Sequence, residues 1–164
     1  LRSQHLSNMN TDRIYEILWN DAATSASVMA VIPCNALKYV TTSRGCYIVN
    51  CNENSYLRGD VGHWLFLRIH SSGRRDDDTR LEVFDALGAK AYNDEINMFM
   101  RQFDHCSINY EHISNVNCGF YALVYSYYRC RKFTPSSILN ILKGVGDVEK
   151  HCLLLYSAKK ACNC

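Results

Sequence analysis

The sequence lacks any run of about 18 apolar residues, so we expect no membrane-spanning helix and no membrane partner. It also has no internal repeat and no large excess of charge. Its 18 basic and 16 acidic residues give a net charge of +2, which argues neither for nor against a nucleic-acid partner. What is present is a chain of 164 residues, 48% of them hydrophobic. We therefore expect one globular domain over residues 1–164, with a core of its own.

The nine cysteines lack the spacings that bind metals. There is no CxxC pair and no Cys/His quartet of the zinc-finger type, so the sequence predicts no metal site and requires no cofactor. Because nine is an odd number, the cysteines cannot all pair within one chain. Several lie in apolar stretches, where a free thiol packs like a small hydrophobic group. These features favour an intracellular, reducing compartment.

The apolar patterns predict a helix, a group of strands and then more helices, which is the order of an α+β fold. We expect strands over 28–32, 46–49, 64–69, 81–84 and 107–110, and helices over 11–22, 35–39, 95–103, 118–128, 135–142 and 147–159. The helix over 118–128 carries no charged side chain. It is therefore expected to be a buried central helix, packed against an antiparallel-rich sheet.

Cys118 is the first residue of this buried helix, directly after the polar turn 114–117. The positive end of a helix dipole favours the thiolate, which is the form of cysteine that attacks carbonyl carbons. Gly119 beside it would let a substrate approach the turn closely. The alternative is a buried cysteine with a purely structural role, which this feature alone leaves open.

Two further residues indicate the same chemistry. His63 precedes the strongest predicted strand, and Asp85 ends the next one. If these strands pair as an antiparallel hairpin, the end with His63 meets the end with Asp85. His63 could then take the thiol proton of Cys118, while Asp85 accepts a hydrogen bond from the second ring nitrogen. The alternatives are a histidine without catalytic work and an aspartate that caps a turn.

An ordered set of three motifs resembles the adenovirus-type (adenain-like) cysteine proteases: Gly62-His63-Trp64, Phe84-Asp85-Ala86-Leu87-Gly88 and Asn117-Cys118-Gly119-Phe120-Tyr121. The likeness is strongest to the proteases of Polinton/Maverick elements and adenovirus-like DNA viruses. Proteases that process SUMO and related modifiers belong to the same clan and share the catalytic order. The resemblance implies a papain-like α+β fold with Cys118, His63 and Asp85 as its catalytic triad.

The resemblance also implies a substrate and activators. The substrate would be a viral or element-encoded capsid or core precursor, cut at glycine-containing sites and running past Trp64 and Gly119. The activators would be a short peptide attached through Cys106 and DNA, and the location would be the host nucleus or the virion. For DNA contact, the sequence offers two small basic clusters, 74–75 and 129–132, whose alternative interpretation is solvated surface.

One position departs from the family pattern. Where the family has an oxyanion-hole glutamine, this sequence has Glu111, followed by His112. A carboxylate cannot donate a hydrogen bond to an oxyanion. Three explanations stay open: His112 donates instead, Glu111 is protonated, or the hole is weakened. Two other functions also stay open. One is an isopeptidase for ubiquitin-like modifiers; the other, which Glu111 motivates, is a catalytically weakened binding module with the same fold.

Overall fold

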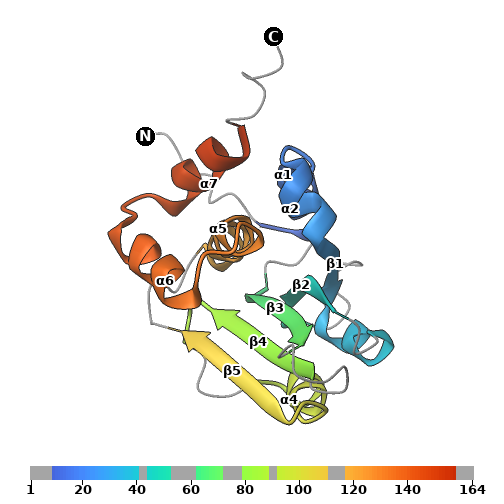
Figure 1. The fold of residues 1–164 in the computed structure, drawn as a ribbon. Coiled ribbons are helices and arrows are strands. Elements are labelled where there is room, and N and C mark those ends of the chain that lie inside the picture. Colours follow the sequence, from blue (N-terminus) through green and yellow to red (C-terminus); the bar gives the residue numbers. More distant parts are fainter. Residues whose placement is uncertain are drawn as a thin grey trace.

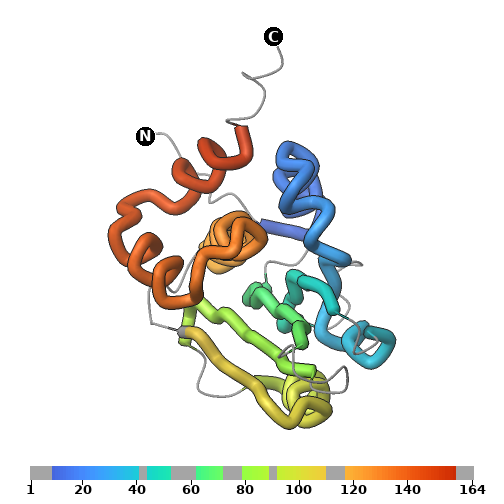
Figure 2. Tube along the Cα trace, in the orientation of Figure 1, coloured from blue at the N-terminus to red at the C-terminus, as the bar shows by residue number. Residues whose placement is uncertain are grey.

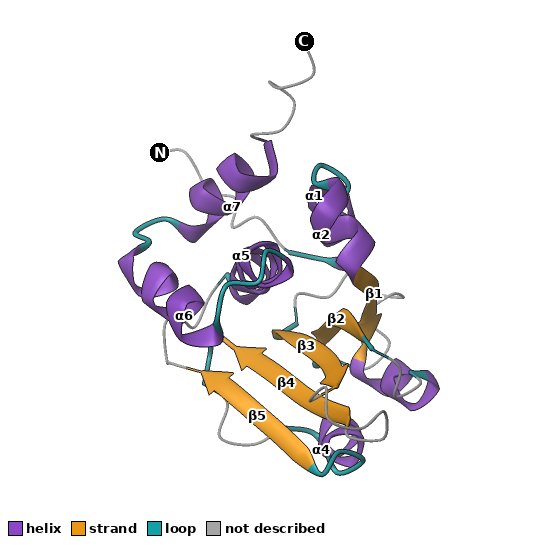
Figure 3. Cartoon of the chain, in the orientation of Figure 1, coloured by secondary structure: helices purple, strands orange, loops and turns teal. Residues whose placement is uncertain are grey.

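The computed structural model describes residues 9–40, 44–52, 62–71, 79–88, 92–110 and 117–157, and Figure 3 distinguishes their helices and strands. The strands are β1 (Val28–Pro33), β2 (Gly45–Asn50), β3 (Trp64–Ser71), β4 (Thr79–Asp85) and β5 (His105–Tyr110). The helices are α1 (Thr11–Leu18), α2 (Ala22–Ser27), the 3-10 helix η1 (Cys34–Tyr39), α4 (Asp94–Met100), α5 (Cys118–Cys130), α6 (Pro135–Gly144) and α7 (Val148–Ser157). None of the helices in these ranges combines the length and apolar character that a bilayer crossing needs.

The five strands form one mixed sheet in the order β1-β2-β3-β4-β5 (Figure 1). The two inner pairings, β2 with β3 and β3 with β4, are antiparallel. The two outer pairings are parallel, and each is joined through a helical connection, η1 for β1–β2 and α4 for β4–β5. In the β3–β4 pair, Phe66 lies opposite Phe84. This register brings the beginning of β3 beside the end of β4, as the sequence predicted.

Helices cover both faces of this sheet (Figures 1 and 2). On one face, α5 packs directly on the sheet, and α1, α6 and α7 complete that layer of the core. Within it, the rings of Phe84 and Tyr125 stack with centroids 4.1 Å apart. On the other face, η1 and α4 pack against inner-strand residues such as Leu65 and Leu67. Burial on both faces explains why β3 is apolar without alternation.

The α+β class and the buried central helix are confirmed, since every residue of α5 from Gly119 to Ser126 is buried. The helix expected over 11–22 forms but ends earlier, at Leu18. A second helix, α2, begins at Ala22, because Asp21 accepts a hydrogen bond from the Thr24 N–H and caps it. The cap of α1 is Asn10, which accepts from the Arg13 N–H.

Candidate active site

Three side chains from different elements meet where β3 and α5 begin and β4 ends. His63 directly precedes β3, Asp85 is the last residue of β4, and Cys118 is the first of α5. His63 Nε2 donates to Asp85 Oδ1 over 2.7 Å, and the imidazole lies close enough to Cys118 for that side chain to help raise the pKa of His63. Because Nε2 faces Asp85, the ring nitrogen left for the sulfur is Nδ1. The structure thus brings together the three residues that the sequence singled out.

The sulfur of Cys118 is held by backbone groups. The Trp64 N–H donates to Sγ at 3.3 Å, and Sγ lies 3.6 Å from the carbonyl oxygen of Gly62. A backbone N–H pointed at the sulfur stabilises negative charge on it. Asn117 gives α5 no side-chain cap. The Asn117 side chain therefore does not occupy the N–H groups of the first helical turn, which lie beside the thiol.

Asp85 is fully buried and receives several donors. Besides His63, the Leu87 N–H donates to Oδ1 at 2.9 Å, and the Tyr92 hydroxyl donates to Oδ2 at 3.0 Å. A buried carboxylate needs such donors to stay ionised. With both oxygens engaged, the carboxylate has a fixed orientation. Its hydrogen bond with Nε2 in turn fixes the orientation of the His63 ring.

His63 is more basic than a free histidine. Burial on its own would lower the pKa of His63, but hydrogen bonds to Asp85 and Cys118, together with the charges of these groups, raise it from 6.5 to about 9. The imidazole therefore carries its proton at neutral pH, and this positive charge lies beside the Cys118 side chain. Because the folded-state pKa is raised, the stability from this arrangement is complete below about pH 6.5 and is lost as the pH rises through about 9.

The backbone before the nucleophile is unusual. Asn117 has φ of 67°, in the left-handed region. Asparagine is one of the few non-glycine residues that adopt this conformation readily, whereas a β-branched residue does not. The asparagine therefore sets the direction in which the chain enters α5 and presents Cys118.

We expect Asn117→Gly and Asn117→Val to behave differently. Glycine tolerates φ of 67°, so the variant should retain the wild-type rate of Cys118 alkylation within about twofold. Valine should lower the free energy of unfolding by about 1–2 kcal/mol and slow alkylation, because the turn must strain or shift. Thermal unfolding and mass-spectrometric alkylation rates measure both effects. Equal values for the two variants would contradict the proposed role of this turn.

Two glycines at the site are required by close packing. A Cβ atom on Gly62 would collide with the Asn50 side chain, and one on Gly119 would collide with the side chain of Met9. The sequence suggested that a substrate could approach beside Gly119, but the Met9 side chain fills that space. The Trp64 indole is also inside the core, with 1% of its surface exposed and Nε1 donating to the Met9 carbonyl oxygen at 3.1 Å. Trp64 reaches the site through its backbone N–H.

No protein-family model matches the chain, and no curated protein matches its sequence. Among solved structures, the chain is similar to the crystal structure of the ASFV pS273R protease, with 14% sequence identity and a TM-score of 0.41. The similarity covers 68% of this chain and 43% of that protein, so the chain spans less than half of the protease's length. The function of the site therefore has to be argued from its own geometry.

The remaining sequence candidates lie away from the three residues or outside the described ranges. Glu111 and His112 belong to the residues that are not described. Cys106 is exposed on β5, opposite Leu81 of β4 and toward the other end of that strand from Asp85. Cys106 therefore does not contribute to the constellation around the sulfur.

Two basic residues at the end of α5 are engaged within the fold. Arg129 Nε donates to Glu82 Oε1 at 2.9 Å, and Arg131 pairs with Asp21 at 2.8 Å. These guanidinium groups stabilise contacts between elements. The second basic cluster, 74–75, lies outside the described residues.

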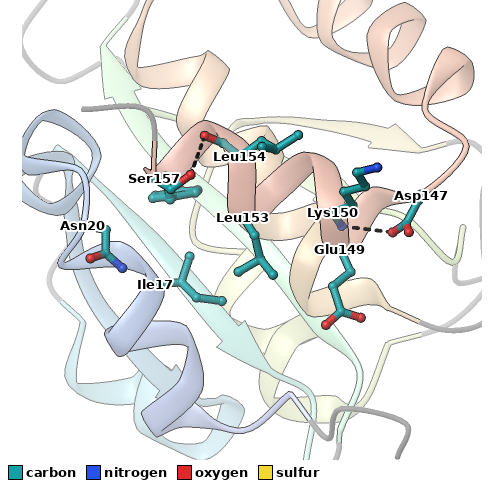
Figure 4. Close-up of a pocket in the computed structure, with 9 residues that line it drawn as sticks. Ile17, Asn20, Asp147, Glu149, Lys150, Leu153, Leu154 and Ser157 are labelled. Atoms are coloured by element: carbon teal, nitrogen blue, oxygen red, sulfur yellow. Dashed lines mark hydrogen bonds between the residues drawn. The ribbon is translucent and has the colours of Figure 1, made fainter. Parts of the chain in front are cut away.

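A pocket of about 560 Å³ lies between α1 and α7, with Ile17 and Leu153 facing one another across it (Figure 4). None of the three site residues lines it. In the described part of the chain, no group of three or more His, Cys, Asp or Glu side chains is arranged to hold a metal ion.

Proposed function

We propose that the chain is a cysteine endopeptidase of the adenovirus type, with Cys118 as nucleophile, His63 as general base and acid, and Asp85 as the residue that orients His63. The observation that supports this is the convergence of the three side chains: Asp85 is hydrogen-bonded to His63, and His63 interacts in turn with Cys118. A thiol, an imidazole and a carboxylate in this order are the parts that acyl transfer by cysteine requires.

Before the first step, the Cys118 proton has already moved to His63 Nδ1, in keeping with an imidazole that is protonated at neutral pH. In the first step, Sγ bonds to the carbonyl carbon of the peptide. The carbonyl electron pair moves to oxygen, where the N–H groups at the start of α5 are suited to stabilise the negative charge. The C–N bond then breaks, and the leaving nitrogen takes the proton from Nδ1. Asp85 stays ionised and keeps Nε2 as the donor nitrogen throughout.

In the second step, His63 Nδ1 takes a proton from water, and the hydroxide attacks the thioester between Cys118 and the substrate. The C–S bond breaks, the electron pair returns to sulfur, and the proton on Nδ1 restores the starting state. The products are a carboxylic acid and the amine released earlier. Every proton in this cycle passes through Nδ1, the ring nitrogen that Asp85 does not occupy.

We further propose a capsid or core precursor with glycine at the cut as the substrate, and the host nucleus or virion as the location if the chain is viral. Otherwise an intracellular reducing compartment is proposed. For activation, we propose a short peptide attached through Cys106, whose side chain is exposed on an edge strand, and DNA. These proposals rest on the family resemblance of the sequence.

A glycine-containing peptide with a C-terminal electrophile tests the function. We expect it to label Cys118 at least about tenfold faster than any other cysteine at neutral pH. Competing thiols are mostly protonated there, because burial raises the pKa of Cys46 to about 11 and that of Cys152 to about 12. Mass spectrometry of the labelled peptides assigns the site.

The outcomes separate the alternatives. Labelling spread over several cysteines, with none preferred, would argue for a binding module that lacks the reaction. Labelling of Cys118 by folded ubiquitin-like modifiers that carry the same electrophile, but not by the short peptide, would favour the isopeptidase. Cleavage of the short peptide at glycine would support the endopeptidase directly.

A further inference from the structure

Two adjacent residues just before α4 are linked to the His63–Asp85 pair, one directly to Asp85 and the other to His63 through Cys51. The Tyr92 hydroxyl donates to Asp85 Oδ2 at 3.0 Å. Asn93 Nδ2 donates to the carbonyl oxygen of Cys51 at 2.8 Å, and the Cys51 N–H donates to the carbonyl oxygen of His63 at 2.8 Å. One dipeptide thus reaches Asp85 through a side chain and His63 through the backbone of Cys51.

This dipeptide is itself fixed to α4. Asn93 Oδ1 accepts from the Ile96 N–H at 3.0 Å and so caps the helix. Asn97 Nδ2 donates to the Tyr92 carbonyl oxygen at 2.8 Å, one turn into the helix. Ile96 and Phe99 are buried in the core layer between α4 and the sheet. The position of Tyr92 is therefore set by a packed element and not by a free loop.

The chemistry of the Tyr92 contact suits a positioning role. Burial, the charge of Asp85 and the hydrogen bond to it raise the pKa of Tyr92, so the hydroxyl keeps its proton and acts as a donor at any working pH. It engages Oδ2, while His63 and the Leu87 N–H engage Oδ1. The carboxylate therefore cannot rotate about its Cβ–Cγ bond without losing a partner.

We propose that Tyr92 is a positioning residue of this site: its hydroxyl fixes the Asp85 carboxylate toward His63, and with Asn93 it couples the geometry of the pair to α4. Where activity is the measure, this inference rests on the proposed function. The geometry of the His63–Asp85 hydrogen bond supplies a second measure that does not.

Tyr92→Phe removes the hydroxyl and keeps the ring. We expect kcat to fall roughly tenfold with KM unchanged within about twofold, since one hydrogen bond to a charged group is lost and no substrate contact is changed. Tyr125→Phe is the control, because Tyr125, which is buried, likewise donates to a carboxylate, Glu82, at 2.7 Å. Its kcat should stay within about twofold of wild type, although both variants lose one tyrosine–carboxylate hydrogen bond.

Proton NMR of the His63 Nε2–H provides the measure that needs no substrate. In Tyr92→Phe, its exchange with solvent should accelerate about tenfold, because the carboxylate is less constrained; in Tyr125→Phe it should not change. If Tyr92→Phe does not fold, Asn97→Ala loosens the Tyr92 backbone instead and should accelerate exchange about two- to fivefold.

The proposed function and the proposed role of Tyr92 can be refuted separately. A wild-type chain that cleaves no peptide would refute the proposed function, while the exchange measurement would still decide the role of Tyr92. Equal exchange rates and equal loss of kcat in Tyr92→Phe and Tyr125→Phe would overturn the inference. The inference would also be overturned if the loss of kcat in both variants were in proportion to their loss of thermal stability.

Discussion

Replacing Cys118 with alanine is expected to abolish peptide cleavage, with a fall in kcat on the order of 10⁴-fold or more. The sulfur forms the covalent bond to substrate in the proposed cycle, and Cys118 is the thiol whose interaction helps raise the pKa of His63. The fold should persist, because alanine is the best helix former and Cys118 is only half-buried at the start of α5. Cleavage of a glycine-containing peptide, with thermal unfolding measured beside it, tests both parts.

Cys130→Ala is the matched control for this experiment. Cys130 is half-buried at the other end of the same helix, and its Sγ contacts the Tyr127 carbonyl oxygen at 3.2 Å. The variant should cleave within about twofold of the wild-type rate, with a comparable change in stability. If Cys118→Ala retained more than about one hundredth of the wild-type kcat, the thiol would have no part in the rate-determining chemistry.

The central parts of the site could be predicted because each follows from a local signal. A histidine directly before an apolar strand and an aspartate at the end of the next one are brought together by hairpin pairing, which the register of Phe66 with Phe84 bears out. The uncharged stretch that begins at Cys118 indicated a buried helix, and α5 is one. In these places, short-range pattern and tertiary structure agree.

The parts that could not be predicted depend on side chains that meet across the fold. Nothing in the sequence near Tyr92 shows that its hydroxyl reaches back to Asp85, since the contact depends on how α4 packs under the sheet. The same holds for Trp64, whose place in the core depends on Met9 lying against it. The break between α1 and α2 was missed because the apolar residues of 11–22 continue a helical spacing across it.

Replacing Asp85 tests the electrostatic half of the proposed mechanism. Asp85→Ala should lower kcat by about 10³–10⁴-fold, because His63 loses the partner that fixes its tautomer and charge. It should also lower the free energy of unfolding by about 2–4 kcal/mol, since the Tyr92 hydroxyl and the Leu87 N–H lose a buried acceptor. Asp94→Asn, at an exposed position in the first turn of α4, is the control and should change neither quantity beyond about twofold or 0.5 kcal/mol.

Asp85→Asn separates charge from hydrogen bonding. The amide keeps one acceptor oxygen for His63 Nε2–H but removes the negative charge that helps to raise the pKa of His63 to about 9. We therefore expect the pKa of His63 to fall, and the alkaline limit of kcat/KM to move to lower pH with it, because the imidazolium that gives the leaving nitrogen its proton is lost earlier as pH rises. NMR titration of the His63 ring and the pH profile of cleavage should shift in the same direction. A His63 titration that stays at about pH 9 in Asp85→Asn would show that the aspartate does not set the charge state of the base, and the role given to Asp85 would have to be abandoned.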